Sequence, residues 1–453
     1  WLALSAFAAP TVDGTVDAEY GVPVAVQTVE TQFGDNLSEL DAAYARVEGG
    51  DLYLVFTGNL ENNFNKLVVF IDSQAGGENV LTASVGSGGA NPGNDGWADR
   101  WAGLAFDSGF SADYLFIARN GNDGNEVFVL DFAHVGADVS ESFYAPFGFN
   151  REGSATNLGT VDVDVGFDNS NTGGVVGGVA AADPVAAAAV TTGLELRVPL
   201  ASIGSPTTDV RIAAFIVSQG HDFLSNQALG GYAAPQANLG GDGAGNFIGN
   251  LSGIDLTAFA GDQFFGVSPY PGIDQLAVDS LVITEIMQNP APPVADGAGE
   301  WFEVHSLNNE AFDLAGLELR DQGSDSHTVA GSLVVGPNEF VVFRRNADTV
   351  TNGGVAVDYV YSGIDLANGA DELELYNGVD VIDAVVWDGG PAFPDPDGAS
   401  MQLDLISLDA TANDFGASWC EATQPFGDGS QLGNPGDFSE ICGGADADTD
   451  ADA

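Results

Sequence analysis

LVITEIMQNPAPPVADGAGEWFEVHSLNNEAFDLAGLELRD, residues 281–321, is the stretch that decides the fold of this chain. It contains three short pieces in which apolar and polar residues alternate, separated by a Pro-rich turn and a polar turn. In the middle piece Phe302 and Val304 fall on one face, and Glu303 and His305 fall on the other. This alternation predicts β-strands with one buried face. The Glu303 face is expected to be solvated or to face a partner.

Composition extends this prediction to the whole chain. The 453 residues are enough for two or three domains, and 45% hydrophobic content is typical of a globular protein. Sixty-one glycines and nineteen prolines separate short apolar runs, which favours all-β structure with many turns. No stretch keeps helical periodicity over three turns, and Pro184 interrupts the nearest approach. We predict two β-sandwich domains in tandem.

The net charge of −56 limits the partners of the protein. Such a chain repels phosphate backbones and anionic membrane surfaces, so we expect no nucleic-acid partner. No segment after the first residues is long and apolar enough to span a bilayer, so direct membrane insertion is not expected. Two interpretations of the charge remain open, and both can hold. One is solubility in salty water, and the other is divalent-cation binding by carboxylates.

Both ends of the chain indicate export. Residues 1–9, WLALSAFAA, look like the end of a signal peptide with a small-residue cleavage site. Cys420 and Cys442 are the only cysteines and flank a Gly- and Pro-rich loop. A disulfide between them is expected in an oxidising compartment, with two buried thiols as the alternative. Residues 443–453 repeat Asp at every second position and predict a disordered acidic tail.

The C-terminal half resembles the lamin tail domain, an immunoglobulin-like β-sandwich. The resemblance begins with the opening stretch and continues through LAGLELRD, VVGPNEFVVFRRN, IDLANGADELELYNGVDVIDAVVW and GASMQLD to SWCEATQPFGDGSQLGNPGDF. The Pro-rich loop and the cysteine pair are additions to the family pattern. Members of that family are taken to be binding or structural modules. The resemblance therefore implies a fold at residues 281–442 and no chemistry of its own.

The N-terminal half carries a second resemblance. TVDGTVDAEYG, at residues 11–21, is similar to the start of family 9 carbohydrate-binding-like β-sandwich modules. GNLENNFNKLVVFIDSQAGGENVL, AGLAFDSGFSADYLF, GHDFLSNQALGG and IDLTAFAGDQFFGV resemble a secreted domain of surface proteins from planctomycete- and myxobacterial-type bacteria. This implies a cellular location more than an activity. We place this domain at residues 10–267, followed by a linker at 268–280.

Catalytic motifs are missing from the sequence. It contains no G-x-S-x-G, P-loop, H-E-x-x-H or G-x-G-x-x-G pattern, and its four histidines are far apart. His221 and Asp222 form the most site-like pair, because a carboxylate beside an imidazole can fix its tautomer. The alternative is a histidine that locks a turn. We predict that the protein is not an enzyme.

Two Gly-bent loops carry oxygen ligands of the kind that Ca²⁺ prefers. One offers Asn120, Asn122, Asp123 and Glu126, and the other offers Asp395 and Asp397. The alternative for each is an ordinary Asx-type turn. Ca²⁺ is the one cofactor that the sequence suggests.

Trp97 and Trp101 lie four residues apart and are candidates for stacking on a glycan. Packing in the core is the alternative fate of both rings. Together these features predict a non-enzymatic extracellular structural or adhesive surface protein. It is expected to self-associate, or to bind neighbouring surface proteins, as filaments or a coat supported by Ca²⁺. The alternative function is a carbohydrate-binding module of a secreted protein.

Overall fold

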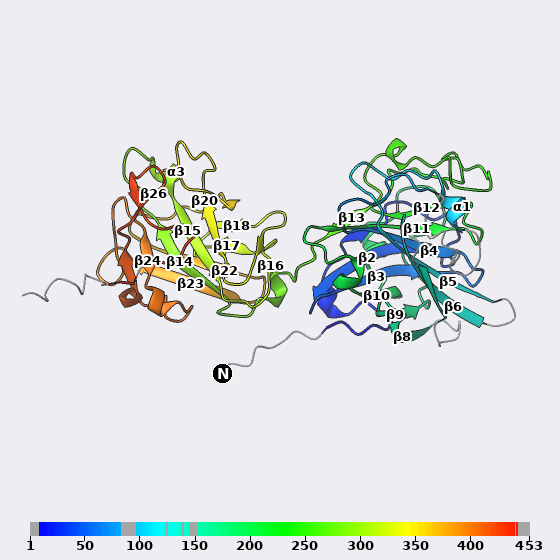
Figure 1. Ribbon diagram of the computed structural model, residues 1–453, viewed down its shortest axis with the longest axis horizontal. Coiled ribbons are helices and arrows are strands. Elements are labelled where there is room, and N and C mark those ends of the chain that lie inside the picture. Colours follow the sequence, from blue (N-terminus) through cyan, green and yellow to red (C-terminus); the bar gives the residue numbers. More distant parts are fainter. Residues whose placement is uncertain are drawn as a thin grey trace, which may run out of the picture. The chain divides into compact units, whose positions relative to one another are not determined.

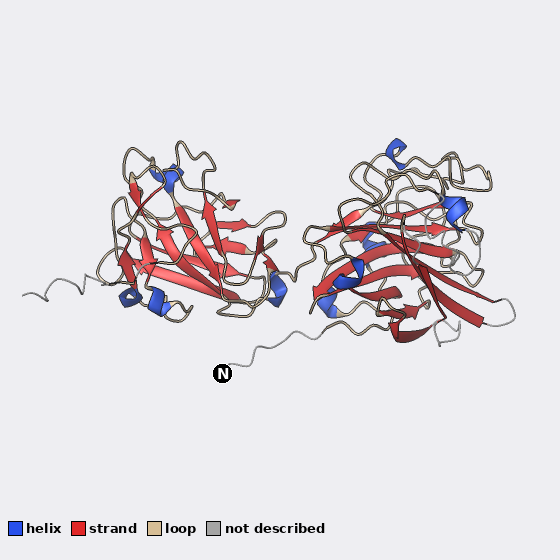
Figure 2. Cartoon of the chain, viewed as in Figure 1, coloured by secondary structure: helices blue, strands red, loops and turns tan. Residues whose placement is uncertain are grey.

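The computed structural model describes residues 9–82, 97–122, 126–136, 140–144, 152–439 and 441–442. The chain divides into an N-terminal unit, Ala8–Pro269, and a C-terminal unit that begins at Tyr270. Nearly all regular structure is β-strand (Figures 1 and 2). The prediction of an all-β chain with tandem β-sandwiches is therefore confirmed.

Two antiparallel sheets form the N-terminal unit (Figure 1). The first has the order β1 (Ala25–Val26), β2 (Glu39–Glu48), β3 (Asp51–Asn59), β10 (Gly193–Pro199), β9 (Val163–Asp168) and β8 (Glu152–Leu158). The second has the order β12 (Leu224–Leu229), β11 (Val210–Val217), β4 (Lys66–Asp72), β5 (Tyr114–Asn122), β6 (Glu126–His134) and β7 (Ser140–Tyr144), and β13 (Phe265–Val267) pairs with β11.

The core of this unit follows the alternation along its strands. Leu52, Leu54 and Phe56 of β3 point into the cluster between the two sheets, as their spacing predicts. The intervening Tyr53 and Val55 are buried as well, in a cluster on the opposite face of the first sheet. The N-terminal segment contributes Val12, Val16 and Tyr20 to that cluster. Both faces of the sheet are therefore covered.

Two antiparallel sheets also form the sandwich of the C-terminal unit. The larger, which we call the covered sheet, has the order β21 (Tyr359–Val360), β20 (Phe340–Arg344), β15 (Trp301–Ser306), β14 (Leu281–Met287), β24 (Met401–Leu403) and β25 (Trp419–Glu421), with β20 and β21 parallel. The smaller is β18 (Ser326–Thr328), β17 (Glu318–Arg320), β22 (Ala370–Tyr376) and β23 (Val381–Asp388). Two short pairs are β16 (Phe312–Asp313) with β19 (Val334–Val335) and β26 (Pro425–Phe426) with β27 (Gln431–Leu432).

The inner faces of these sheets enclose the second large core. Phe302 and Val304 of β15 lie in it, as predicted above. Leu373 and Leu375 of β22 lie in it too, as the alternation of Leu and Glu at residues 372–375 predicts. The outer face of the smaller sheet follows the prediction too, since Glu372 and Glu374 are only partly buried. The outer face of the covered sheet does not follow it, and it carries the candidate site.

Helices are few and short. The described ones are α1 (Trp97–Trp101), α2 (Pro184–Ala188), α3 (Asp296–Gly299) and the 3₁₀ turns η1 (Ala18–Tyr20), η3 (Leu200–Ile203), η4 (Leu256–Ala258), η5 (Ile273–Gln275), η6 (Leu405–Ser407) and η7 (Gly416–Ser418). Pro184 begins α2 and does not interrupt it, because Asp183 caps the first turn and Pro fits the first helical position. None of the described helices is long and apolar enough to cross a membrane.

The boundary between the units lies between Pro269 and Tyr270, inside the expected linker. Most of that linker is packed against the C-terminal unit. Leu276 is buried in its core, Ile273 packs beside it, and Gly272 forms a β-bridge with Asp313. The segment expected to be a linker thus contributes to the core of the C-terminal unit.

Candidate functional site: a buried carboxyl pair under the C-terminal segment

Five side chains form one row across the outer face of the covered sheet. The register pairs Val342 with Glu303, Glu303 with Glu285, Glu285 with Gln402, and Gln402 with Cys420. Residues directly opposite each other in antiparallel strands share a face, with Cβ atoms about 5 Å apart. Two carboxyl groups therefore stand side by side in the middle of the sheet. Both glutamates are 0% exposed.

Hydroxyl groups and backbone amides surround this pair. The Ser400 hydroxyl and the Asn434 N–H donate to Oε1 of Glu285, the latter at 2.9 Å. The Thr284 hydroxyl donates to Oε1 of Glu303 at 2.6 Å, and the Gly436 N–H donates to Oε2 at 2.5 Å. Among the described residues neither carboxyl forms an ion pair.

Residues 433–438, which we call the covering segment, lie over the two glutamates on the outer face of the covered sheet. The backbone N–H groups of Asn434 and Gly436 belong to it, so each glutamate binds this segment directly. Phe438 packs on the rings of His305 and Phe340, with centroid distances of 5.4 and 5.0 Å. Gly433 lies so close that a Cβ there would be 2.8 Å from Oε1 of Glu285.

The β26–β27 hairpin covers the other end of the same face. Phe426 stacks edge-on against Trp301 at 5.7 Å between ring centroids and joins a cluster with Met287 and Val342. The Gln431 side chain binds the backbone of Ala291 through both its oxygen and its nitrogen, at 2.9 and 2.8 Å. The chain after β25 therefore covers much of the outer face of the covered sheet.

Burial controls the electrostatics of the pair. It raises the pKa of Glu285 from 4.5 to about 7, against the opposing effect of the hydrogen bonds from Ser400 and Asn434. Burial, and then the charge of Glu285, raise the pKa of Glu303 well above its usual value. Burial also lowers the pKa of His305, which favours the neutral imidazole. At neutral pH the site therefore retains protons that exposed glutamates have lost.

This arrangement corrects the prediction for the strand around Trp301. The Glu303 and His305 face was expected to be solvated or to face a partner, but both side chains are buried. Alternation shows which residues share a face, and it cannot show that a segment about 130 residues later covers that face. The charged residue Glu285 inside the apolar run LVITEIM was the one local signal for a polar site.

The predicted disulfide is confirmed. Cys420 and Cys442 are bonded, with 5.7 Å between their Cα atoms. Cys420 stands at the end of the carboxyl row, and the Gln402 side-chain nitrogen lies 3.7 Å from its Sγ. The bond therefore closes a loop that contains the hairpin and the covering segment.

The predicted calcium ligands lie in two separate parts of the chain, and most of the first set falls outside the described residues. Asn120 lies in β5 with its side-chain oxygen buried, while Asp395 and Asp397 are exposed in the loop between β23 and β24. Asp123 and the side chains of Asn122 and Glu126 fall outside the described part of the chain. Within the described residues, no group of three or more His, Cys, Asp or Glu side chains is placed to hold a metal ion.

The structure overturns the glycan-stacking prediction for Trp101. The ring is fully buried, its Nε1–H donates to Nδ1 of His221 at 3.1 Å, and it packs edge-on against Phe70. Its face is therefore inaccessible to a sugar. The side chain of Trp97 lies outside the described residues.

His221 corresponds to the turn-locking alternative. It has φ +54°, it is buried, and its N–H donates to the Ser218 carbonyl at 3.1 Å. Asp222 accepts from the Ser218 hydroxyl at 2.9 Å and pairs with Arg100 at 3.3 Å. The pair shapes the turn after β11.

A buried carboxylate also explains the motif TVDGTVDAEYG. Glu195 of β10 accepts the N–H groups of Asp13 and Gly14, each at 2.9 Å, and the Tyr20 hydroxyl at 2.7 Å. Gly14 has φ +93°, and a Cβ there would lie 2.5 Å from the backbone nitrogen of Asp168. Burial raises the pKa of Glu195 against these donors. The motif therefore fixes the N-terminal segment to the first sheet.

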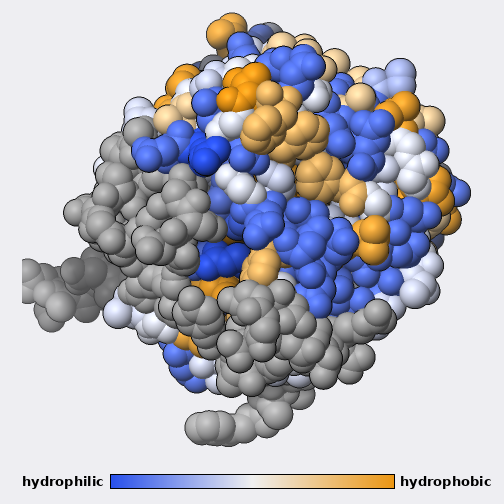
Figure 3. Space-filling view, turned by 90° about the vertical axis from the view of Figure 1, so that its right-hand side faces the viewer, coloured by the Kyte–Doolittle hydropathy of each residue, from blue (hydrophilic) through white to orange (hydrophobic). Residues whose placement is uncertain are grey.

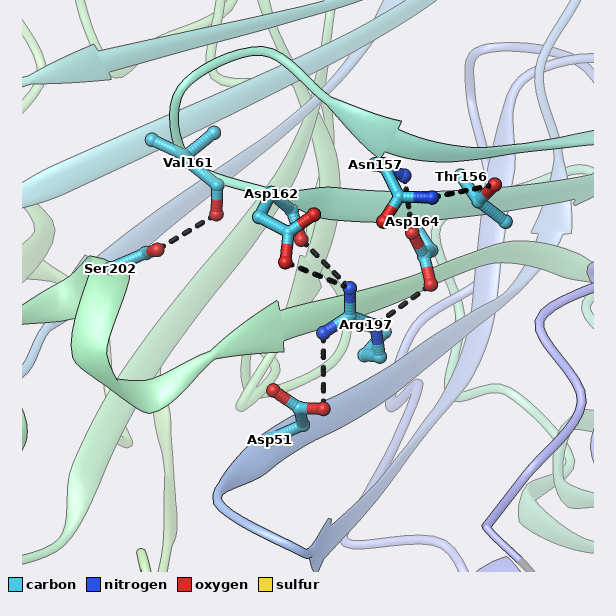
Figure 4. A network of polar contacts seen from close by, with 8 residues as sticks. All are labelled: Asp51, Thr156, Asn157, Val161, Asp162, Asp164, Arg197 and Ser202. Carbon is cyan, nitrogen blue, oxygen red and sulfur yellow. Dashed lines mark hydrogen bonds and ion pairs between the residues drawn. The ribbon is translucent and has the colours of Figure 1, made fainter.

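Arg197 lies two residues after Glu195 in β10 and shows how the few cationic side chains are used. Figure 4 shows its guanidinium among three carboxylates, with Asp164 at 2.7 Å, Asp51 at 3.0 Å and Asp162 at 3.6 Å. The hydrogen bond that Arg197 donates to Asp164 is the main cause that raises the pKa of the guanidinium. One internal cation thus ties β3, β9 and β10 together.

The comparisons with known proteins agree with the C-terminal fold. A family model described as Lamin Tail Domain matches residues 275–389, which span most of the sandwich from β14 to β23. This family is immunoglobulin-like and non-catalytic. No curated protein and no solved structure matches the chain.

Proposed function

We propose that this protein is a non-enzymatic extracellular structural or adhesive module. Its two β-sandwiches associate with further copies, or with neighbouring surface proteins, as a filament or a coat. Cations in the medium, Ca²⁺ among them, support that association. The protein acts through its surface and not through a reaction site.

The observation that carries this proposal is the use of cationic side chains. The chain has 66 Asp and Glu residues and only 10 Lys and Arg residues. Every described Lys and Arg is held by a carboxylate or a backbone carbonyl of the same unit: Lys66, Arg46, Arg100, Arg119, Arg197, Arg211, Arg320, Arg344 and Arg345. The remaining surface charge is overwhelmingly negative. Much of the face in Figure 3 is hydrophilic, with apolar residues in small groups.

Two such surfaces repel each other unless ions intervene. At an ionic strength of 0.15 M charges are screened over about 8 Å, and a divalent cation can also bridge carboxylates directly. Association is therefore expected to depend on salt and to respond most strongly to Ca²⁺.

Three further observations support the non-enzymatic and extracellular parts. The C-terminal sandwich matches a non-catalytic family. The strongly buried carboxylates, such as Glu195 and Asp383, are occupied by backbone N–H groups of their own unit. The Cys420–Cys442 bond is of the kind that persists in oxidising compartments.

Light scattering and negative-stain microscopy of the full chain test this proposal. We expect monomers in low salt with EDTA, and ordered assemblies as CaCl₂ is added, with NaCl at equal ionic strength less effective. Monomers at every Ca²⁺ and salt concentration would contradict self-association. Specific binding on a glycan array by a chain that stays monomeric would favour the carbohydrate-binding alternative.

A further inference from the structure

Two buried oxygen atoms of the carboxyl row lack a hydrogen-bond donor. They are Oε2 of Glu285 and Oε1 of Gln402. Gln402 lies directly opposite Glu285 in the sheet, and its side-chain nitrogen, not its oxygen, contacts Cys420 in β25. Two buried acceptors on opposed residues need a donor to offset their burial. A protonated Glu285 supplies that donor.

The surroundings of the pair offer no compensating charge among the described residues. Val342 and Cys420 flank the row, and the covering segment contributes the negative Asp437, which disfavours ionisation of Glu303. His305 is two residues from Glu303 in β15. Arg344 of β20 donates to the carbonyls of Gly299, Asn352 and Val355. Ionising both glutamates would therefore place two like charges side by side in a covered site that holds hydrogen-bond donors but no cation paired with either carboxyl among the described residues.

We propose that Glu285 and Glu303 form a proton-controlled latch for the covering segment. While at least one of them is protonated, the segment stays seated on the sheet through the N–H groups of Asn434 and Gly436. When both ionise, repulsion and the need for water lift the segment away. The disulfide limits this opening to a tethered loop. The latch is independent of the proposed assembly.

The sign of the pH dependence follows from the protonation states. An unfolded glutamate titrates at about 4.3, whereas burial raises the pKa of Glu285 to about 7 and raises the pKa of Glu303 well above its usual value. The stabilisation of the closed segment is therefore complete below the unfolded value and is lost as pH rises through the folded values. Phe438 packs against the neutral imidazole of His305. Protonation of His305 at low pH would place a charge in the same site and would destabilise the closed segment.

Hydrogen exchange of the full chain tests the latch. Protection factors for the Asn434 and Gly436 amides, corrected for intrinsic exchange, should fall at least about tenfold between pH 6 and pH 9. Amides of β22, in the opposite sheet, serve as the internal reference. In Glu303→Gln, which leaves Glu285 as the one titrating glutamate of the row and keeps an acceptor, the fall over the same range should be at least about threefold smaller than in the unmodified chain.

Two variants make the test specific. Glu285→Gln provides a second variant with a single titrating carboxyl if Glu303→Gln does not fold, and Glu310→Gln replaces an exposed carboxyl and should behave as the unmodified chain does. Protection that is independent of pH in the unmodified chain would overturn the proposal. A second result would also overturn it: CaCl₂ restores full amide protection at pH 9 in the unmodified chain but not in Glu303→Gln. That result would show that the row binds a cation.

Discussion

Glu195 holds the N-terminal segment through the hydrogen bonds that its carboxylate accepts. Its carboxylate is the acceptor for Asp13, Gly14 and Tyr20, and it is fully buried. Glu195→Ala leaves three donors without a partner, so we expect the free energy of unfolding of the N-terminal unit to fall by roughly 3 kcal/mol. Guanidinium denaturation of the full chain measures the change.

Tyr20→Phe, which removes only the hydroxyl, should cost about 1 kcal/mol. The exposed Asp209→Ala is the matched control and should leave unfolding unchanged. If Glu195→Ala denatured at the same concentration as this control, the N-terminal segment would not depend on the carboxylate.

At the scale of single residues, the sequence predicts faces well and burial poorly. Leu373 and Leu375 point inward while Glu372 and Glu374 remain partly exposed, as alternation requires. Glu303 obeys the same alternation, yet it is buried because later residues cover it. For Trp101 the sequence left glycan stacking and core packing open, and core packing is what the structure shows, through contacts with Phe70 and His221 that are distant in the sequence.

The loop closed by the disulfide is the element with the clearest separate contribution. Twenty-two positions separate Cys420 from Cys442. Closing a loop of that length stabilises a fold by about 3 kcal/mol, chiefly by restricting the unfolded chain. We therefore expect the Cys420→Ser/Cys442→Ser double variant to lower the unfolding free energy of the C-terminal unit by that amount.

Hydrogen exchange during denaturation reports the unfolding free energy of each unit separately. The N-terminal unit should not respond, and the unmodified protein treated with reductant should match the double variant. An equal loss in both units would show that the effect is not local to the loop.

Elements were easier to predict than their arrangement. Alternating apolar residues predict strands at 281–287, 52–57 and 301–305. The first coincides with β14, and the other two differ from β3 and β15 by a residue or two at their ends. Period-2 patterns are local, so one sequence suffices for them. Which segment covers which sheet depends on contacts between distant residues, and no local pattern encodes them.

For the whole molecule, buried acids set the dependence of stability on pH. Burial is the main cause that raises the pKa of Glu39 to about 8 and those of Asp41, Glu285 and Asp383 to about 7. Each folded value lies above the unfolded one, so stability is complete only below the unfolded values near 4, falls as pH rises from there to the folded values, and is lowest above about pH 8. We expect a Tm lower by roughly 5 °C or more at pH 8.5 than at pH 5.5.

Thermal unfolding at constant ionic strength with EDTA present measures this shift. Replacing Asp383 by Asn should reduce the dependence, because its carboxylate accepts from Ile283 and Asn413 in the core. A Tm that rose with pH would show that buried carboxyls ionise without cost in this fold.

Composition alone predicted that the molecule is polyanionic. The structure shows that the described cationic side chains are paired inside each unit, so they offset little of the negative charge at the surface. Ten cationic residues could have lain on the surface, but those described are used inside each unit, as Arg197 is with its three aspartates. A count of charges cannot show this, because it depends on which strands become neighbours.

The burial and pairing of the lysine and arginine side chains also affect proteolysis. Trypsin-like proteases recognise a lysine or arginine that can leave the surface of its substrate and enter a deep pocket. Here Lys66 and Arg344 are buried, Arg119 and Arg197 are paired with carboxylates of neighbouring strands, and Arg46 is held by Glu48 and by the Glu19 carbonyl. Such enzymes find few places to begin on the folded chain, so the scarcity of positive charge also protects the protein from digestion.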